Sequence, residues 1–76
     1  MQKAITSKKY ADLINWLKQA RLDQKMGMRQ LALRLDKPHS FVQKVEMLER
    51  RLDVYEYTYY CSALNLDPCV GLKYLS

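Results

Sequence analysis

The stretch LALRLDKPHSFVQKV, residues 31–45, is the part of this chain that most constrains its fold. Apolar residues recur at helical spacing on both sides of a proline: Leu31, Ala32 and Leu35 before it, and Phe41, Val42 and Val45 after it. Because Pro38 disfavours the helical conformation at Lys37, one helix must end before the next begins. The link is only two or three residues long, and a link that short makes two helices cross steeply, as in a helix-turn-helix.

The rest of the chain predicts further short helices and no repeats. Apolar spacing places helices over about 7–22, 28–35, 38–48 and 68–75, and another follows residue 53 with an apolar stripe at 57, 60, 61 and 64. Residues that favour helix starts precede or open these segments: Ser7, Gly27, Pro38, an Asp53–Glu56 capping box, and Asp67 with Pro68. The sequence therefore predicts an all-α fold, a compact five-helix domain over residues 1–76 with 1–6 as a flexible tail.

Two segments leave alternatives open at this stage. The tyrosines of DVYEYTYYC favour a strand by propensity, but the caps at both ends and the apolar stripe favour a helix. The last helix is expected to use Val70, Leu72 and Leu75 as its apolar set. Trp16 fits either the core or an interface.

The net charge of +5 is unevenly distributed along the chain. Residues 1–38 carry nine Lys and Arg against three Asp, a net +6, whereas residues 53–76 carry a net −2. This asymmetry favours a polyanionic partner that faces the first half of the molecule. Lys3, Lys8 and Lys9 could form a basic arm, although a solvated tail is the simpler interpretation.

Several classes of protein are disfavoured by what the sequence lacks. No apolar run approaches the roughly 20 residues that span a bilayer, and the N-terminus has no signal-peptide core, so a cytoplasmic protein is expected. Cys61 and Cys69 have no metal-ligand spacing, and we expect two ordinary buried or half-buried thiols. There is no carboxylate pair, nucleophile–histidine arrangement or phosphate-binding glycine loop. We therefore expect no enzyme, metal, cofactor or small-molecule effector.

The predicted helix over 38–48 has one apolar side and one hydrogen-bonding side. Its apolar set is Phe41, Val42, Val45 and Leu48, while its outward-facing polar set is His39, Ser40, Gln43 and Lys44. The second helix of a helix-turn-helix can enter the major groove of DNA with polar side chains near its N-terminal end. The sequence thus indicates a recognition helix.

The stretches LALRLDKPHSFVQKVEMLERRLD and RRLDVYEYTYYCSALNLDP resemble the Cro/CI-like (XRE) helix-turn-helix transcriptional regulators of the lambdoid phage repressor type. The resemblance runs from about Leu17 to Leu72 and implies a lambda repressor-like DNA-binding domain. It implies DNA base contacts from His39, Ser40, Gln43 and Lys44. It also implies a structural ion pair between Arg21 and Glu46.

The sequence departs from the family pattern at three places. Gly27 and Met28 stand where the family has a threonine or serine and then a phosphate-binding glutamine, so phosphate binding would shift to Arg29 or to backbone N–H groups. Asp36 and Leu48 replace turn glycines. Asp tolerates a left-handed conformation, but Leu does not, so either the helix continues past 48 or the link takes another path. The expected phosphate contacts are Arg29, Arg34, Lys37, Arg50 and Arg51.

The expected function is that of a small dimeric repressor that places residues 38–48 in the major groove of a palindromic operator in double-stranded DNA. Tyr55, Tyr59 and Tyr74 fall off the core stripe, and they suggest a homodimer contact. Two alternatives stay open: a protein-interaction module such as an antitoxin-like partner, and a restriction-modification controller protein. A bacterial, phage or plasmid context is expected.

Overall fold

The computed structural model describes residues 7–76, so the predicted tail over 1–6 lies outside the described residues. The described part contains five α-helices, one short 3-10 helix and no strand. These elements are α1 (Lys8–Asp23), α2 (Met28–Leu35), α3 (His39–Glu46), α4 (Val54–Ala63), α5 (Pro68–Leu72) and η1 (Lys73–Leu75). The all-α, five-helix prediction is confirmed.

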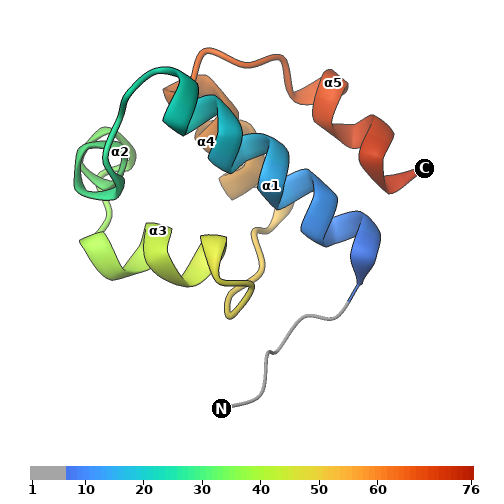
Figure 1. Cartoon of the computed structure of the whole chain (residues 1–76), viewed down its shortest axis with the longest axis horizontal. Coiled ribbons are helices and arrows are strands. Elements are labelled where there is room, and N and C mark those ends of the chain that lie inside the picture. The colour runs from blue at the N-terminus through green and yellow to red at the C-terminus, as the bar shows by residue number, and fades with distance from the viewer. Residues whose placement is uncertain (1–6) are drawn as a thin grey trace.

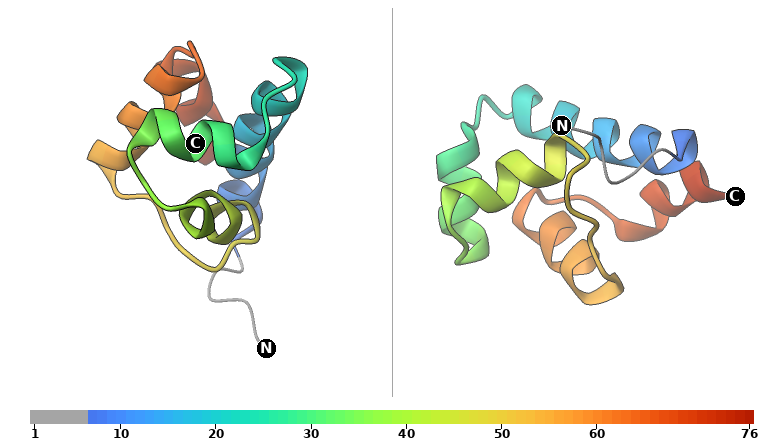
Figure 2. Two further views of the ribbon diagram at one scale, coloured as in Figure 1. Left: turned by 90° about the vertical axis from the view of Figure 1, so that its left-hand side faces the viewer. Right: turned by 90° about the horizontal axis from the view of Figure 1, so that it is seen from below.

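The helices pack around α1, the longest of them, which crosses the molecule (Figure 1). α2 and α3 pack against each other at one end of α1, and α2 also contacts α4. α3 lies along the side opposite α5, and the chain then returns through α4 so that α5 and η1 pack against α1 (Figures 1 and 2). The arrangement leaves one long side of α3 without a covering element.

The core is built from the apolar stripes that the sequence predicts. Its most fully buried side chains come from α1, α2, α3 and α4 and from the C-cap of α4: Leu17, Leu31, Val42, Val45, Tyr60, Cys61 and Leu64. The tyrosine-rich segment is helical, because Tyr57, Tyr60, Cys61 and Leu64 all turn inward at helical spacing. The helix prediction over this segment is therefore confirmed against the strand alternative.

The predicted caps form as hydrogen bonds. Ser7 Oγ accepts from the Tyr10 amide at 3.3 Å at the start of α1. At α4, Asp53 accepts from the Glu56 amide at 2.7 Å and Glu56 accepts from the Asp53 amide at 3.0 Å, which completes the capping box. Asp67 accepts from the Cys69 amide at 2.9 Å before α5. Each bond satisfies a helix-end amide that has no partner within the helix.

The end of α3 differs from the prediction. The helix begins at His39, with Pro38 as its N-cap, and it ends at Glu46 rather than at 48. Leu48 adopts a left-handed conformation with φ 62°, as does Asp36 with φ 56°. The Glu49 amide donates to the Lys44 carbonyl at 2.9 Å, which closes the helix end. Leu48 packs partly buried against the core, and this packing offsets a backbone cost of about 1–2 kcal/mol.

The last helical segment also corrects the sequence interpretation. α5 stops at Leu72 and η1 follows, and the expected apolar set Val70, Leu72 and Leu75 is 43%, 49% and 42% exposed. Gly71 is the buried residue of α5, since a side chain there would overlap the Tyr57 hydroxyl and the Trp16 ring. Close packing of α5, rather than an apolar stripe, attaches it to the domain.

The two cysteines have different environments. Cys61 is fully buried in the core, as expected, but Cys69 is exposed on α5, which contradicts the expectation of two buried or half-buried thiols. Neither forms a disulfide bond in the described part of the chain.

Candidate nucleic-acid interface

The open side of α3 carries all four residues expected to contact DNA bases. His39, Ser40, Gln43 and Lys44 are exposed, whereas Phe41, Val42 and Val45 are buried against the rest of the domain. Because residues four apart share a helix face, Ser40 and Lys44 lie one turn apart beside Gln43. The structure therefore places these side chains on one exposed face of α3, the helix that runs along the lower edge of the domain in Figure 1.

Met47 extends the same surface by one turn, and the sequence interpretation did not name it. Its side chain is 50% exposed at the C-cap of α3. Ser40, Gln43, Lys44 and Met47 follow the spacing i, i+3, i+4, i+7, which is one helix face. The same spacing can be read from the sequence, but only polar residues were predicted for this face.

The turn between α2 and α3 fixes how far α3 projects. The Lys37 amide donates to the Ala32 carbonyl at 3.0 Å and the Asp36 amide donates to the Leu33 carbonyl at 3.2 Å. Asp36 reaches this geometry by adopting the left-handed conformation that its short polar side chain tolerates. The two helices then pack directly against each other.

The ion pair expected between Arg21 and Glu46 is present and buried. Arg21 Nε donates to Glu46 Oε2 at 2.7 Å and Nη2 donates to Oε1 at 3.0 Å, while Nη1 donates to the Met26 carbonyl at 2.7 Å. The two side chains are only 7% and 4% exposed. The pair joins α1 to the last residue of α3 and lies away from the exposed polar face.

The five expected phosphate-binding residues fall into two groups. Arg29, Lys37 and Arg51 are exposed and have no carboxylate partner within residues 7–76. Arg34 is exposed but donates to the Ala63 carbonyl at 3.1 Å, at the end of α4. Arg50 is half-buried, and its guanidinium pairs with Glu56 at 2.9 Å and 2.8 Å. This pairing was not predicted, because it joins the link after α3 to the first turn of α4.

Glu56 is held in its charged form by this environment. The hydrogen bonds from Arg50, followed by the bond from the Asp53 amide, lower the pKa of Glu56 to about 2. The same residue therefore caps α4 and neutralises Arg50.

The three tyrosines expected at a dimer contact do not form one cluster. Tyr55 and Tyr59 stack on each other on the outer side of α4, with ring centroids 6.2 Å apart and nearly parallel planes at 5°. Tyr74 packs instead against Trp16 of α1, with ring centroids 6.2 Å apart. Trp16, whose role the sequence left open, is half-buried beside Gly71.

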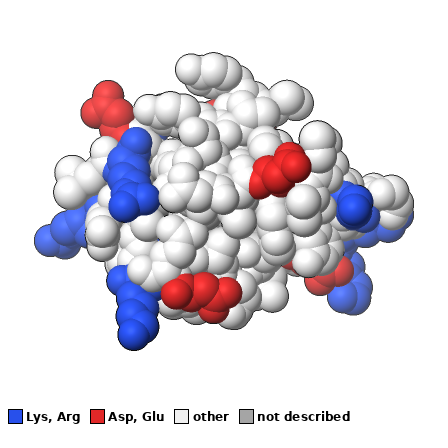
Figure 3. Space-filling view, turned by 90° about the horizontal axis from the view of Figure 1, so that it is seen from above, with Lys and Arg blue, Asp and Glu red and all other residues white. Residues whose placement is uncertain are grey.

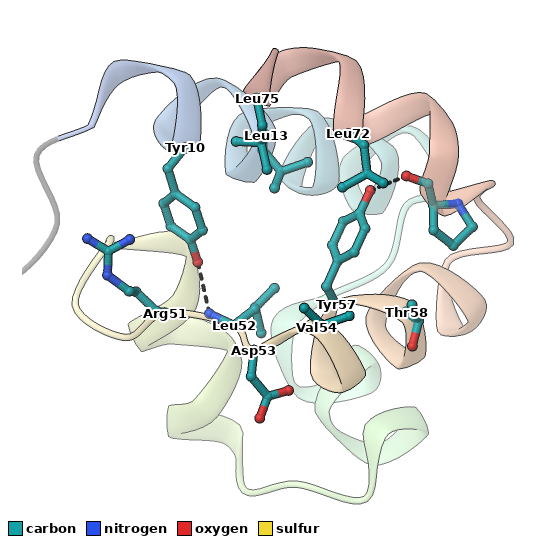
Figure 4. Close-up of a pocket in the computed structure, with 11 residues that line it drawn as sticks. Tyr10, Leu13, Arg51, Leu52, Asp53, Val54, Tyr57, Thr58, Leu72 and Leu75 are labelled. Carbon is teal, nitrogen blue, oxygen red and sulfur yellow. Dashed lines mark hydrogen bonds between the residues drawn. The ribbon is translucent and has the colours of Figure 1, made fainter.

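An apolar pocket of about 280 Å³ lies between α1, α4 and α5. Its lining includes Tyr10 and Leu13 of α1, Val54 and Tyr57 of α4, Leu72 of α5 and Leu75 of η1 (Figure 4). The Tyr10 hydroxyl accepts from the Leu52 amide at 3.0 Å and the Tyr57 hydroxyl donates to the Pro68 carbonyl at 2.5 Å. The polar atoms of both tyrosines are thus occupied, and the pocket presents apolar surface.

Neither a membrane span nor a metal-binding cluster is found within residues 7–76. No helix there is both long enough and apolar enough to cross a bilayer. No group of three His, Cys, Asp or Glu residues in this part of the chain is placed to hold a metal ion.

Comparison with known proteins finds similar solved structures. An XRE-family like protein from Pseudomonas syringae pv. tomato str. DC3000 is 40% identical, with 88% of this chain and 82% of that chain covered and a TM-score of 0.81. The wild-type restriction-modification controller protein C.Esp1396I is 18% identical, with 92% and 90% covered and a TM-score of 0.80. The tetramer of that protein in complex with its natural 35 base-pair operator gives 18% identity, 92% and 92% coverage and a TM-score of 0.80. No protein-family model and no curated protein matches the chain.

Proposed function

This chain belongs to the XRE family, and from that premise we propose that it is a sequence-specific DNA-binding transcriptional regulator. The observation that carries the proposal is the exposed face of α3, where Ser40, Gln43 and Lys44 project from a helix held by its buried side. A helix of this kind fits the major groove, whose base pairs present distinct patterns of donors and acceptors.

Each side chain of this face offers a different kind of base contact. Gln43 can pair with adenine and Lys44 with guanine, while Ser40 can contact either kind of base edge. His39 begins the helix and adds a further hydrogen-bonding group. Met47 adds an apolar contact of the kind that recognises a thymine methyl group.

The basic residues around α3 supply the sequence-independent part of the affinity. Arg29, Lys37 and Arg51 offer exposed and unpaired cations, and Arg34 offers the guanidinium donors that it does not use on Ala63. Contacts of this kind release counterions from DNA, so the affinity should fall steeply as salt increases.

A homodimer is the proposed assembly, through the face that carries α5. Three exposed apolar residues line the pocket on this side, Val54, Leu72 and Leu75, and Val70 and Tyr74 are further exposed apolar residues of α5 and η1. Most of the surface opposite α3 is uncharged, and its Lys and Arg side chains lie toward its two ends (Figure 3). Exposed apolar residues grouped in this way are typical of an interaction site. The operator-bound neighbour C.Esp1396I is a tetramer.

A dimer of this kind would act as a repressor by occupying promoter DNA. Two-fold symmetry places two α3 helices on successive turns of one DNA face, so the site would be palindromic with half-sites about 10 base pairs apart.

The outer face of α4 favours a second candidate function, a protein-interaction module, because Tyr55 and Tyr59 are 76% and 43% exposed and stack on each other.

Selection of binding sites from a random pool of DNA tests the proposal. The wild-type protein should enrich a palindrome, and Gln43→Ala should relax one position in each half-site. Gln30→Ala, an exposed glutamine on α2, is the matched control and should keep the full preference. Absence of any enriched sequence from a folded protein would overturn the proposal and favour the protein-interaction module.

A further inference from the structure

The segment between α3 and α4 lies outside the helices, yet side chains fix three of its backbone groups. Arg50 Nη1 donates to the Arg51 carbonyl at 2.9 Å, and the Leu52 amide donates to the Tyr10 hydroxyl at 3.0 Å. The Asp53 amide donates to Glu56 Oε1 at 3.0 Å. Three consecutive residues are therefore tied to α1, to α4 and to the side chain of Arg50.

Arg50 is the centre of this arrangement. Its two terminal nitrogens bind the two carboxylate oxygens of Glu56, and its guanidinium lies 4.7 Å from the centre of the Phe41 ring. Phe41 belongs to the buried face of α3, and Lys37 lies over the same ring at 5.5 Å. Arg50 thus connects the start of α4 to the underside of the recognition helix.

Arg51 has the opposite character, although it is the next residue. Its side chain is exposed, and its guanidinium lies 5.6 Å from the centre of the Tyr10 ring. No carboxylate within residues 7–76 pairs with it. The residue with the bonded cation and the residue with the free cation are therefore adjacent in the sequence.

We propose that Arg50 and Glu56 are positioning residues of the DNA interface, and that Arg51 is the phosphate contact that they position. This inference rests on the proposed DNA-binding function. It changes the sequence interpretation, which treated Arg50 and Arg51 as equivalent phosphate contacts. The bidentate pair with Glu56 and the bond to the Arg51 carbonyl use three of the five N–H donors of Arg50, and the carboxylate offsets its charge, so Arg50 has less to offer a phosphate than Arg51 has. Arg51 keeps its side-chain donors free of any carboxylate, while Arg50 binds its carbonyl and the next two residues are held through their amides by Tyr10 and Glu56.

Replacement of Glu56 separates this proposal from the alternative by the direction of the effect. If Arg50 is a positioning residue, Glu56→Gln loosens the segment and weakens DNA binding. If Arg50 is a phosphate contact restrained by Glu56, the same change frees its cation and strengthens binding. Glu49→Gln is the matched control, since it removes one negative charge from the same segment, and the Glu49 carboxylate has no ion-pair partner within residues 7–76.

The salt dependence of binding gives an independent test with Arg50→Gln, Arg51→Gln and the double variant. Each phosphate contact contributes about 0.9 to the slope of log Kobs against log salt concentration. Arg51→Gln should reduce the slope by about 0.9, and the double variant should lose no more than that, because Arg50 acts through Arg51. A loss of about 1.8 in the double variant would identify two separate phosphate contacts.

The outcomes distinguish failure of the inference from failure of the proposed function. All variants are compared with wild type on one DNA duplex after circular dichroism has established that each is folded. Weaker binding by Glu56→Gln than by Glu49→Gln, together with non-additive slopes, supports the inference. Tighter binding by Glu56→Gln, or additive slopes, overturns it while DNA binding stands. If the wild-type protein binds no DNA, the proposed function fails, and the inference fails with it.

Discussion

Arg21 and Glu46 lie 25 residues apart in the sequence and meet through two hydrogen bonds, of 2.7 Å and 3.0 Å, between α1 and the end of α3. The third nitrogen of the guanidinium binds the Met26 carbonyl in the link that leads into α2. One buried side chain thus fixes both the entry to the helix-turn-helix and the last residue of α3. The geometry of the exposed face depends on this buried pair.

Removal of one partner of the pair should lower the free energy of unfolding far more than removal of both partners. Arg21→Ala leaves the Glu46 carboxylate buried without its cation, and we expect a loss of about 3–5 kcal/mol in the free energy of unfolding. In a domain of this size, that loss is a large part of the total stability. The combined change Arg21→Met and Glu46→Met should be milder than Arg21→Ala, because no unpaired charge remains. Urea unfolding monitored by circular dichroism measures both; equal losses would contradict the explanation.

The sequence predicts the helices well because local signals agree in most of them. Ser7, Asp53 and Asp67 cap the helices that they were expected to cap, and the apolar stripe of α4 overrides the strand propensity of its tyrosines. The predicted end of α3 was wrong because the left-handed conformation of Leu48 depends on tertiary packing. No local rule predicts that a leucine will accept that conformation.

The exposed face of α3 was also predictable, since helical periodicity alone separates it from the buried side. The contacts of the residues that flank this face were harder to predict. The pair between Arg50 and Glu56 depends on the path of residues 47–53, and this path follows from the unexpected turn at Leu48. Likewise, the role of Gly71 could not be seen, because it arises from the approach of the Trp16 and Tyr57 side chains.

Gly71→Ala should destabilise the attachment of α5. A methyl group at this position would overlap the Tyr57 hydroxyl and the Trp16 ring, which themselves are packed. Overpacking of this kind costs about 1–3 kcal/mol. Gly27→Ala is the matched control, because a side chain at Gly27 meets no atom within 4 Å. Thermal unfolding of the two variants should show the larger decrease in Tm for Gly71→Ala, and an equal decrease would refute the close-packing account.

The two thiols should differ in reactivity. Cys69 is exposed, whereas Cys61 is fully buried, and burial raises the pKa of the Cys61 thiol so that less thiolate is present at neutral pH. A disulfide reagent such as Ellman's reagent should therefore modify one thiol per chain quickly in the native protein. Both should react in denaturant. The native Cys69→Ser variant should show almost no fast reaction, and a fast reaction in that variant would mean that the core around Cys61 opens readily.

The capping box and ion pair of Glu56 should make stability depend on acid pH. The pKa of Glu56 is lowered from 4.5 to about 2, so the folded state binds its proton less readily than the unfolded chain does. The stabilisation is then present above about pH 4.5 and is lost as the pH falls toward 2. The difference in unfolding free energy between wild type and Glu56→Gln should be constant near neutral pH and should shrink in that acid range. A difference that stays constant down to pH 2 would show that the charge of Glu56 contributes no stability.

Polar replacement on the α5 face should separate the two subunits of the proposed dimer. Leu72 and Leu75 are 49% and 42% exposed beside the apolar pocket, so their replacement by Asn removes apolar contact area from the interface but little from the core. Leu33→Asn is the matched control, since Leu33 is 77% exposed on α2. Sedimentation velocity should show monomers for the Leu72→Asn and Leu75→Asn double variant and dimers for the control. The double variant should also bind a palindromic duplex no better than a single half-site, because the second subunit no longer contributes. If Leu33→Asn dissociates the dimer while the double variant does not, the subunits meet elsewhere on the molecule.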